Sequence, residues 1–389
     1  MRALENSRMS SKASRNTSIE ALRLVAVAGI AIFHTFQWTF QAVCTGLPEY
    51  APLAVFPYSG ALGFINLLGC WANEVFFMIS GYFLIPSAVR ALQNGSSAQG
   101  LTRKSFARLK KIVLPTLFYC AVCLFVSMYV YPLPEISLQE IGWLTLGIEF
   151  IWVYATTVCM APLFGLTKNQ LSKKSYTIAV VAVGVLVFII NGYLAAQSSV
   201  NSGEFSWLQK IMSAVTYVIA FLMGGLLRDY TGTTKPRKAR IVAKRSLAAV
   251  LIIAIDLEAA LSATGNLSTM TTLSYKSTSI VSFALAAASL LFAATRDNKT
   301  NHPRVENAIV TLSAATLGFY VMQSLTSSLW RPVFNTTLAN ILASANNPAA
   351  IYIVTGTAIS IAFAPTLLII DAARSLIARS LKQQSTHQR

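Results

Sequence analysis

Ten apolar segments, each close to the length needed to cross a lipid bilayer, constrain this chain more than any other feature. A transmembrane helix needs about 20 consecutive, mostly apolar residues. We expect spans at residues 19–40, 60–88, 112–131, 141–163, 175–195, 207–227, 246–264, 277–294, 307–328 and 348–371. Because lipid cannot satisfy backbone polar groups, such segments fold as α-helices. The sequence therefore predicts an all-α fold, a polytopic membrane helix bundle of about ten transmembrane helices.

The composition supports a single membrane domain. Hydrophobic residues make up 54% of the chain and charged residues only 12%, whereas a soluble domain has about 25% charged residues. We divide the chain into a cytoplasmic N-terminal segment (1–18), a membrane domain (19–371) and a cytoplasmic tail (372–389). The first span contains Arg23 and His34 and has no clear cleavage site, so we expect it to be retained.

The positive charges are distributed very unequally between the two sides of the predicted membrane. A net charge of +17 could indicate nucleic-acid binding, but the basic residues lie in short loops. Of the 31 Lys and Arg residues, 27 lie in the termini and in the loops that share their side; only Lys210, Lys276 and Arg331 lie opposite. Cytoplasmic loops accumulate Lys and Arg. This predicts a multi-pass protein of the cell membrane with both termini cytoplasmic, in contact with membrane lipids and not with nucleic acid.

The first span contains three ionisable residues on one face. Arg23 and His34 are eleven residues apart, which places them at nearly the same azimuth of a helix and about 16 Å apart along its axis. Glu20 lies on the same stripe. This arrangement suits a cofactor with phosphates at the cytoplasmic face and a reactive end near His34, which could take a proton from a hydroxyl. The alternative is that Arg23 reaches lipid headgroups and His34 bonds within the bundle.

The second span also carries polar residues at membrane depth. Asn66, Asn73 and Ser80 recur every seven residues, and Glu74 is adjacent to Asn73. Asn and Ser can simply join helices by hydrogen bonds. An ionisable residue inside the membrane is costly and indicates function, so Glu74 is a candidate functional residue.

Further candidates lie later in the chain. Arg108 and Lys111 share a helix face just before the third span, where they could bind phosphates or anionic lipids. Inside later spans lie the ionisable residues Glu149, Asp256 and Glu258, and a polar stripe formed by Ser313, Thr316, Tyr320 and Gln323. Each could line a cavity or join helices. The three histidines are too few and too dispersed to predict a metal site.

Several short motifs occur in a characteristic order. Residues 19–23 read IEALR, His34 follows after ten residues, and residues 74–82 read EVFFMISGY. The basic residues 108–111 (RLKK) then precede Pro115, and looser matches follow at 151–154 (IWVY) and 317–320 (LGFY). In this order the motifs resemble the acyltransferase 3 family of integral membrane acyltransferases.

The resemblance implies an enzyme that moves an acyl group, often acetyl, from acyl-CoA to a hydroxyl of a surface or lipid-linked carbohydrate. It implies ten spans with both termini inside, in agreement with the charge distribution. Carried onto this chain, it implies catalytic roles for His34 and Glu74 and cofactor phosphates at Arg23, Arg108 and Lys111. Supporting roles fall to Glu20, Asn73, Ser80, Tyr82 and Gln323. Many relatives have His where this chain has Gln323, which affects the identity of the acceptor.

Two other functions remain open on the sequence. A transporter of a glycan or a lipid-linked precursor could use the same polar stripes as a path, although no inverted repeat is visible. A non-catalytic receptor or scaffold would leave the stripe of Arg23 and His34 unexplained. Transfer of label from acyl-CoA to a surface polysaccharide separates an acyltransferase from both.

Overall fold

The computed structural model describes residues 16–136, 149–198, 206–273, 278–296, 302–344 and 346–387. Nearly all of these residues are helical, and no strand occurs among them. The all-α prediction is therefore confirmed.

Thirteen α-helices follow one another along the described part of the chain. Their bounds are α2 (Thr17–Cys44), α3 (Tyr58–Gln93), α4 (Ala98–Tyr129), α5 (Glu149–Gln170), α6 (Lys173–Ser198), α7 (Ser206–Thr233), α8 (Pro236–Ala263), α9 (Leu267–Leu273), α10 (Ile280–Thr295), α11 (Pro303–Ser313), α12 (Thr316–Leu325), α13 (Ser327–Ser344) and α14 (Pro348–His387). Two short 3₁₀ helices, η1 (Pro48–Leu53) and η2 (Pro134–Ile136), lie in the connections.

The long apolar helices agree with a polytopic membrane bundle. In the described part of the chain, eight helices are long and apolar enough to cross a membrane, namely α2 to α8 and α14. The consecutive helices α11 and α12, bent by 47°, would make a ninth span. Helix α10, where the eighth span was predicted, is apolar but only 16 residues long. Residues 141–148 of the predicted fourth span and residue 277 of the eighth lie outside the described residues.

Local sequence signals set where several helices begin. The side chain of Asn16 accepts a hydrogen bond from the backbone N–H of Ile19 at 3.1 Å, which caps α2. Proline occupies the first turn of α8, α11 and α14, where its missing N–H costs nothing. Helix α14 continues beyond Asp371, the predicted end of the last span, because the following residues are mostly good helix formers.

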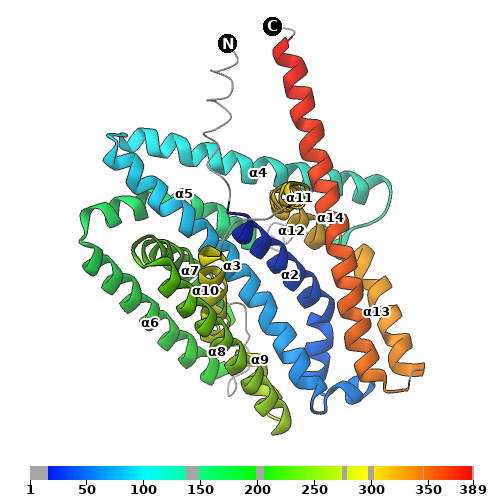
Figure 1. The fold of residues 1–389 in the computed structure, drawn as a ribbon. Coiled ribbons are helices and arrows are strands. Elements are labelled where there is room, and N and C mark those ends of the chain that lie inside the picture. Colours follow the sequence, from blue (N-terminus) through cyan, green and yellow to red (C-terminus); the bar gives the residue numbers. More distant parts are fainter. Residues whose placement is uncertain are drawn as a thin grey trace.

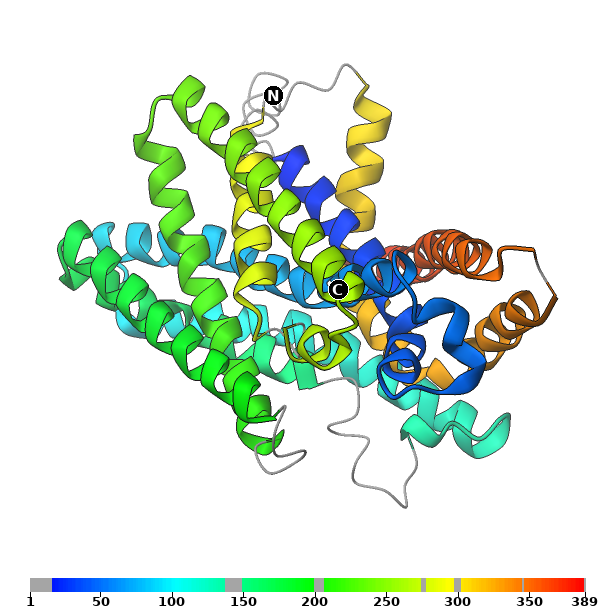
Figure 2. The same ribbon diagram turned by 90° about the horizontal axis from the view of Figure 1, so that it is seen from below.

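Helix α3 lies at the centre of the bundle and contacts α2, α5, α7, α8 and α10. Helices α6, α7 and α8 lie on one side of the pair α2–α3, and α13 and α14 lie on the other (Figures 1 and 2). Helix α4 crosses the other long helices obliquely, towards the end of the bundle from which α14 projects (Figure 1). This arrangement places α2 between α3 and α14.

The contact between α3 and α7 is made backbone to backbone. A Cβ atom added to Gly81 would overlap the carbonyl oxygen of Phe221, and one added to Gly224 would overlap the carbonyl oxygen of Met78. Small residues allow membrane helices to approach closely. The glycine of the Ser80–Gly81 motif therefore has a packing function.

Candidate active site

A cavity of about 880 Å³ opens in the half of the bundle where α2 ends and where α3, α5 and α7 begin. Polar side chains supply much of its wall. The amide residues are Gln37, Gln41, Asn66, Asn73 and Gln323, the aromatic residues are Phe33, Phe40, Phe150, Tyr217 and Tyr320, and the ionisable residues are His34, Glu135, Glu149, Lys210 and Arg331. The volume is within the range of about 300–1,000 Å³ that is usual for ligand sites.

His34 stands in the wall of this cavity, on the inner face of α2. Its Nδ1 atom lies 3.0 Å from Oε1 of Gln323, which comes from α12. The imidazole ring also meets the ring of Tyr320 edge-on, with centroids 6.5 Å apart. The structure thus brings together two of the residues selected from the sequence, His34 and Gln323.

Gln323 is held from more than one direction. Its backbone carbonyl oxygen accepts a hydrogen bond from Nε1 of Trp330 at 3.0 Å. This bond spans the break between α12 and α13 at Thr326. The side-chain Nε2 atom of Gln323 is buried and has no hydrogen-bond partner in the part of the chain that the structure describes.

The start of α13, beyond that break, is fixed by Glu135 from the 3₁₀ helix η2. Oε1 of Glu135 accepts hydrogen bonds from the hydroxyl of Ser327 at 2.5 Å and from the backbone N–H of Ser328 at 2.6 Å. Oε2 accepts a bond from the hydroxyl of Ser328 at 2.8 Å. Arg331, one turn further on, lies over the ring of Trp330 at 5.4 Å. Glu135 therefore orients the segment that supports Gln323.

A second, smaller pocket of about 60 Å³ adjoins the large cavity. Its wall is mostly apolar and includes Val27, Ile30, Phe76, Ile151, Leu317 and Phe319. Phe150 and Tyr320 line both spaces, and their rings lie 4.6 Å apart. These two rings, hereafter the aromatic partition, separate the small pocket from the large cavity.

The N-terminal end of α2 carries an ion pair between two residues of the predicted polar stripe. Nη1 of Arg23 lies 2.9 Å from Oε2 of Glu20. Glu20 is buried, and a quarter of the Arg23 side chain is exposed. Along α2 the order is therefore the ion pair, then Val27 and Ile30 of the small pocket, then His34 in the large cavity.

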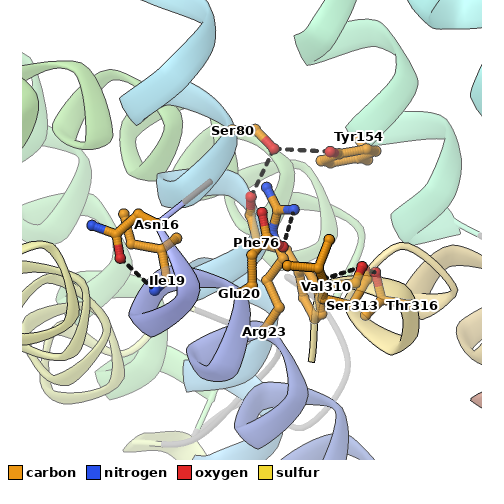
Figure 3. Close-up of polar contacts among 10 residues, drawn as sticks. All are labelled: Asn16, Ile19, Glu20, Arg23, Phe76, Ser80, Tyr154, Val310, Ser313 and Thr316. Atoms are coloured by element: carbon orange, nitrogen blue, oxygen red, sulfur yellow. Dashed lines mark hydrogen bonds and ion pairs between the residues drawn. The ribbon is translucent and has the colours of Figure 1, made fainter. Parts of the chain in front are cut away.

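Hydroxyl groups gather near this ion pair (Figure 3). The hydroxyl of Ser80 donates to the carbonyl oxygen of Phe76 at 2.9 Å and lies 2.8 Å from the hydroxyl of Tyr154. The hydroxyl of Thr316 donates to the carbonyl oxygen of Ser313 at 3.2 Å. Tyr154 and Thr316 both line the small pocket, so its polar side chains come from α5 and α12.

Other residues predicted from the sequence lie elsewhere. Nδ2 of Asn73 donates to the hydroxyl of Tyr217 at 3.2 Å, within the wall of the large cavity. Glu74 is fully buried but lines neither space. The hydroxyl of Ser282 on α10 is close enough to interact with its carboxyl group, but neither carboxyl oxygen has a hydrogen bond of normal length to the described residues.

Tyr82 and the basic residues of α4 also lie away from the large cavity. The hydroxyl of Tyr82 accepts a hydrogen bond from Nη1 of Arg228 at 3.0 Å and lies 3.0 Å from the hydroxyl of Thr231. Arg108 is half-buried and Lys111 exposed. Neither of these cations is joined to Arg23 by a contact among the described residues.

Nothing in the sequence singles out Glu135, Trp330 or Tyr217 as parts of one site. Glu135 and Ser328 are 193 residues apart in the chain, and no motif marks them. No group of three His, Cys, Asp or Glu side chains among the described residues is placed to hold a metal ion.

A family model described as an acyltransferase domain, that of the acyltransferase 3 family, matches residues 16–368. The chain belongs to the acyltransferase 3 family. Searches of curated proteins and of solved structures gave no match. The acyltransferase 3 domain includes every residue of the two cavities and both helices that carry the predicted signature motifs.

Proposed function

We propose that this membrane acyltransferase moves an acyl group, acetyl in the simplest case, from acyl-CoA to a hydroxyl group of a cell-surface or lipid-linked carbohydrate. The observation that carries the proposal is the position of His34. It lines the large cavity beside the ring of Tyr320, where the thioester of a donor that passes Phe150 and Tyr320 from the small pocket would meet an acceptor in the large cavity.

The donor would enter at the N-terminal end of α2. Arg23 would meet the CoA phosphates there, with Arg108 and Lys111 of α4 as further cationic residues. The pantetheine arm would then run along α2 past Val27 and Ile30. The separation of about 16 Å between Arg23 and His34 suits a donor whose charged end stays at the membrane face.

The acceptor would occupy the large cavity. Amide side chains can donate and accept hydrogen bonds with sugar hydroxyls, and aromatic rings give apolar faces on which a sugar ring can rest. The wall of the cavity offers five residues of each kind. This composition supports a carbohydrate acceptor better than an aliphatic alcohol.

His34 would act as the general base. Oε1 of an amide can only accept a hydrogen bond, so neutral His34 would carry its proton on Nδ1 to make this contact with Gln323. Nε2 is then free to take a proton from the acceptor hydroxyl. We place the reaction in the cell membrane with both termini cytoplasmic, as the distribution of basic residues supports.

Transfer of label from radioactive acetyl-CoA in membrane vesicles tests this function. We expect His34→Ala to lower transfer to glycan by about 10²–10⁴-fold, the usual contribution of general base catalysis. His302→Ala is the matched control, because His302 precedes α11 and lines neither cavity. Unchanged transfer by His34→Ala would refute the role of His34.

The size of the large cavity also suits a carrier, which is the second candidate function. A transporter would move the glycan across the membrane without labelling it. Export that continues in His34→Ala while no glycan carries label in the wild type would favour transport.

A further inference from the structure

The unpartnered amide nitrogen of Gln323 lies where the reaction would take place. Gln323 is 1% exposed, and its Nε2 atom has no hydrogen-bond partner among the described residues. The residue lines the large cavity beside His34. Buried polar groups are nearly always hydrogen-bonded. An unpaired donor in a cavity wall therefore indicates that an atom of a bound ligand accepts its hydrogen bond.

The direction of this donor is fixed by the other contacts of the residue. Oε1 is occupied by His34 at 3.0 Å, and the backbone carbonyl is held by Trp330 at 3.0 Å. Because the amide group is planar, fixing Oε1 also fixes Nε2. The donor therefore cannot turn to another partner without breaking the bond to His34.

The other nitrogen atoms in the cavity wall are placed differently. Nδ2 of Asn73 already donates to Tyr217. Gln37, Gln41, Lys210 and Arg331 are exposed, and Asn66 is half-buried. Arg331 lies over Trp330. Among the described lining residues, Nε2 of Gln323 is thus the buried nitrogen donor that has no partner.

We infer that Nε2 of Gln323 donates a hydrogen bond to the carbonyl oxygen of the acyl donor and stabilises the oxyanion that forms on it. The inference rests on the proposed function. Gln323 would then be a catalytic residue with two tasks, since its Oε1 orients the base and its Nε2 binds the oxyanion. Fixed donors directed at developing charge are typically the largest contribution to acyl-transfer catalysis.

The acceptor oxygen forms a bond to the thioester carbon while His34 Nε2 takes the hydroxyl proton, and the carbonyl electron pair moves to the oxygen near Gln323. The C–O double bond then re-forms, the C–S bond breaks, and His34 returns the proton to the thiolate. The products are the ester and the free thiol of CoA, and His34 is neutral again.

Two substitutions separate the two tasks. Gln323→Glu keeps an oxygen for the Nδ1 proton of His34 but removes the N–H donor, whereas Gln323→Met removes both. We expect Gln323→Glu to lower kcat about 10²–10³-fold, the range found when one oxyanion donor is lost, with both KM values nearly unchanged. We expect a larger loss in Gln323→Met. Elution of the solubilised variants as a single species checks that they fold.

A second readout does not depend on turnover. The chain has three histidines, so ¹⁵N-histidine spectra in nanodiscs are simple, and His302→Ala and His387→Ala assign the signal of His34. We expect the proton on Nδ1 in the wild type at a pH where the ring is neutral, and a mixture of tautomers in Gln323→Met.

Three results would overturn the inference. They are an unchanged kcat in Gln323→Glu, a loss confined to the KM of the acceptor, and a wild-type His34 with its proton on Nε2. Failure of the proposed function is distinct, because the wild type would then transfer no label from any acyl-CoA. In that case the inference falls as well.

Discussion

Glu74 and His34 are both membrane-embedded ionisable residues, but their surroundings differ. His34 reaches the large cavity and bonds to Gln323, whereas Glu74 is enclosed between α3 and α10 with no hydrogen bond of normal length to the described residues. A carboxylate is strongly disfavoured in such a place unless it is paired. The surroundings of Glu74 therefore favour a supporting role, and its catalytic role stays a prediction from the sequence.

The substitution Glu74→Gln tests which role is right. The amide keeps the shape of the carboxyl group and removes its charge, so we expect kcat within about threefold of the wild type, too small a change for a residue that acts in the transition state. Labelled acetyl transfer measures kcat, and thermal unfolding measures the stability of the variant. Glu258→Gln, at another buried carboxyl group, is the matched control. A loss of about 100-fold in a folded Glu74→Gln protein would instead support direct catalysis.

At the scale of the elements, the backbones of α3 and α7 approach each other closely. Gly81 and Gly224 face each other's helices so closely that a Cβ atom on either would overlap a backbone carbonyl oxygen. A backbone carbonyl group cannot rotate away from an added methyl group as a side chain can. A substitution there must move one helix.

We expect Gly81→Ala to lower the free energy of unfolding by about 1–3 kcal/mol, the usual cost of overpacking. Gly192→Ala on α6 is the matched control, because nothing lies within 4 Å of the added methyl group. It should be neutral or stabilising, since Ala favours helix over Gly by about 1 kcal/mol. Thermal unfolding in detergent measures both variants. Equal effects at both positions would show that the backbone contact is not a constraint.

The cap on α13 links an element boundary to the active site. Glu135 holds the first turn of α13, and Trp330 in the next turn holds the backbone of Gln323. A substitution at Glu135 should therefore shift the start of α13, and with it Trp330, Gln323 and the contact of Gln323 with His34.

We expect Glu135→Ala to reduce stability by about 1 kcal/mol, the typical value of a helix cap, and to lower acyl transfer as well. Glu49→Ala is the control, since Glu49 is exposed in η1. The measurements are unfolding in detergent and turnover in vesicles. Normal turnover in a destabilised Glu135→Ala protein would show that α13 does not position Gln323.

For the whole molecule, the distribution of basic residues predicts which loops face which side. Single cysteines at Lys174 and Lys210, in a background without the five natural cysteines, should react with a membrane-impermeant thiol reagent from opposite sides. Lys174 should be reached only in inverted vesicles and Lys210 only in intact cells. Labelling of both from one side would contradict the predicted topology.

The helices were largely predictable because apolar length alone decides where a chain can cross a membrane. The ion pair of Arg23 with Glu20 was predictable for a similar reason, since residues three apart share a helix face. The partners of His34 and of Ser328 could not be predicted. Gln323 lies 289 residues from His34 in the chain, and Glu135 lies 193 residues from Ser328. Such pairs depend on how the helices pack, which no local pattern encodes.

The aromatic partition has a consequence for the energetics of the living cell. Phe150 and Tyr320 form a thin layer between the two spaces, and a charge that crossed such a layer in a membrane would respond to a voltage worth about 2.3 kcal/mol per elementary charge per 100 mV. Under the proposed function the thioester and the hydroxyl that react are neutral, and so are the ester and the thiol that form. No net charge then crosses the layer, so the free energy of acyl transfer is independent of the membrane voltage, and vesicles without a membrane potential should label the glycan as well as energised ones do.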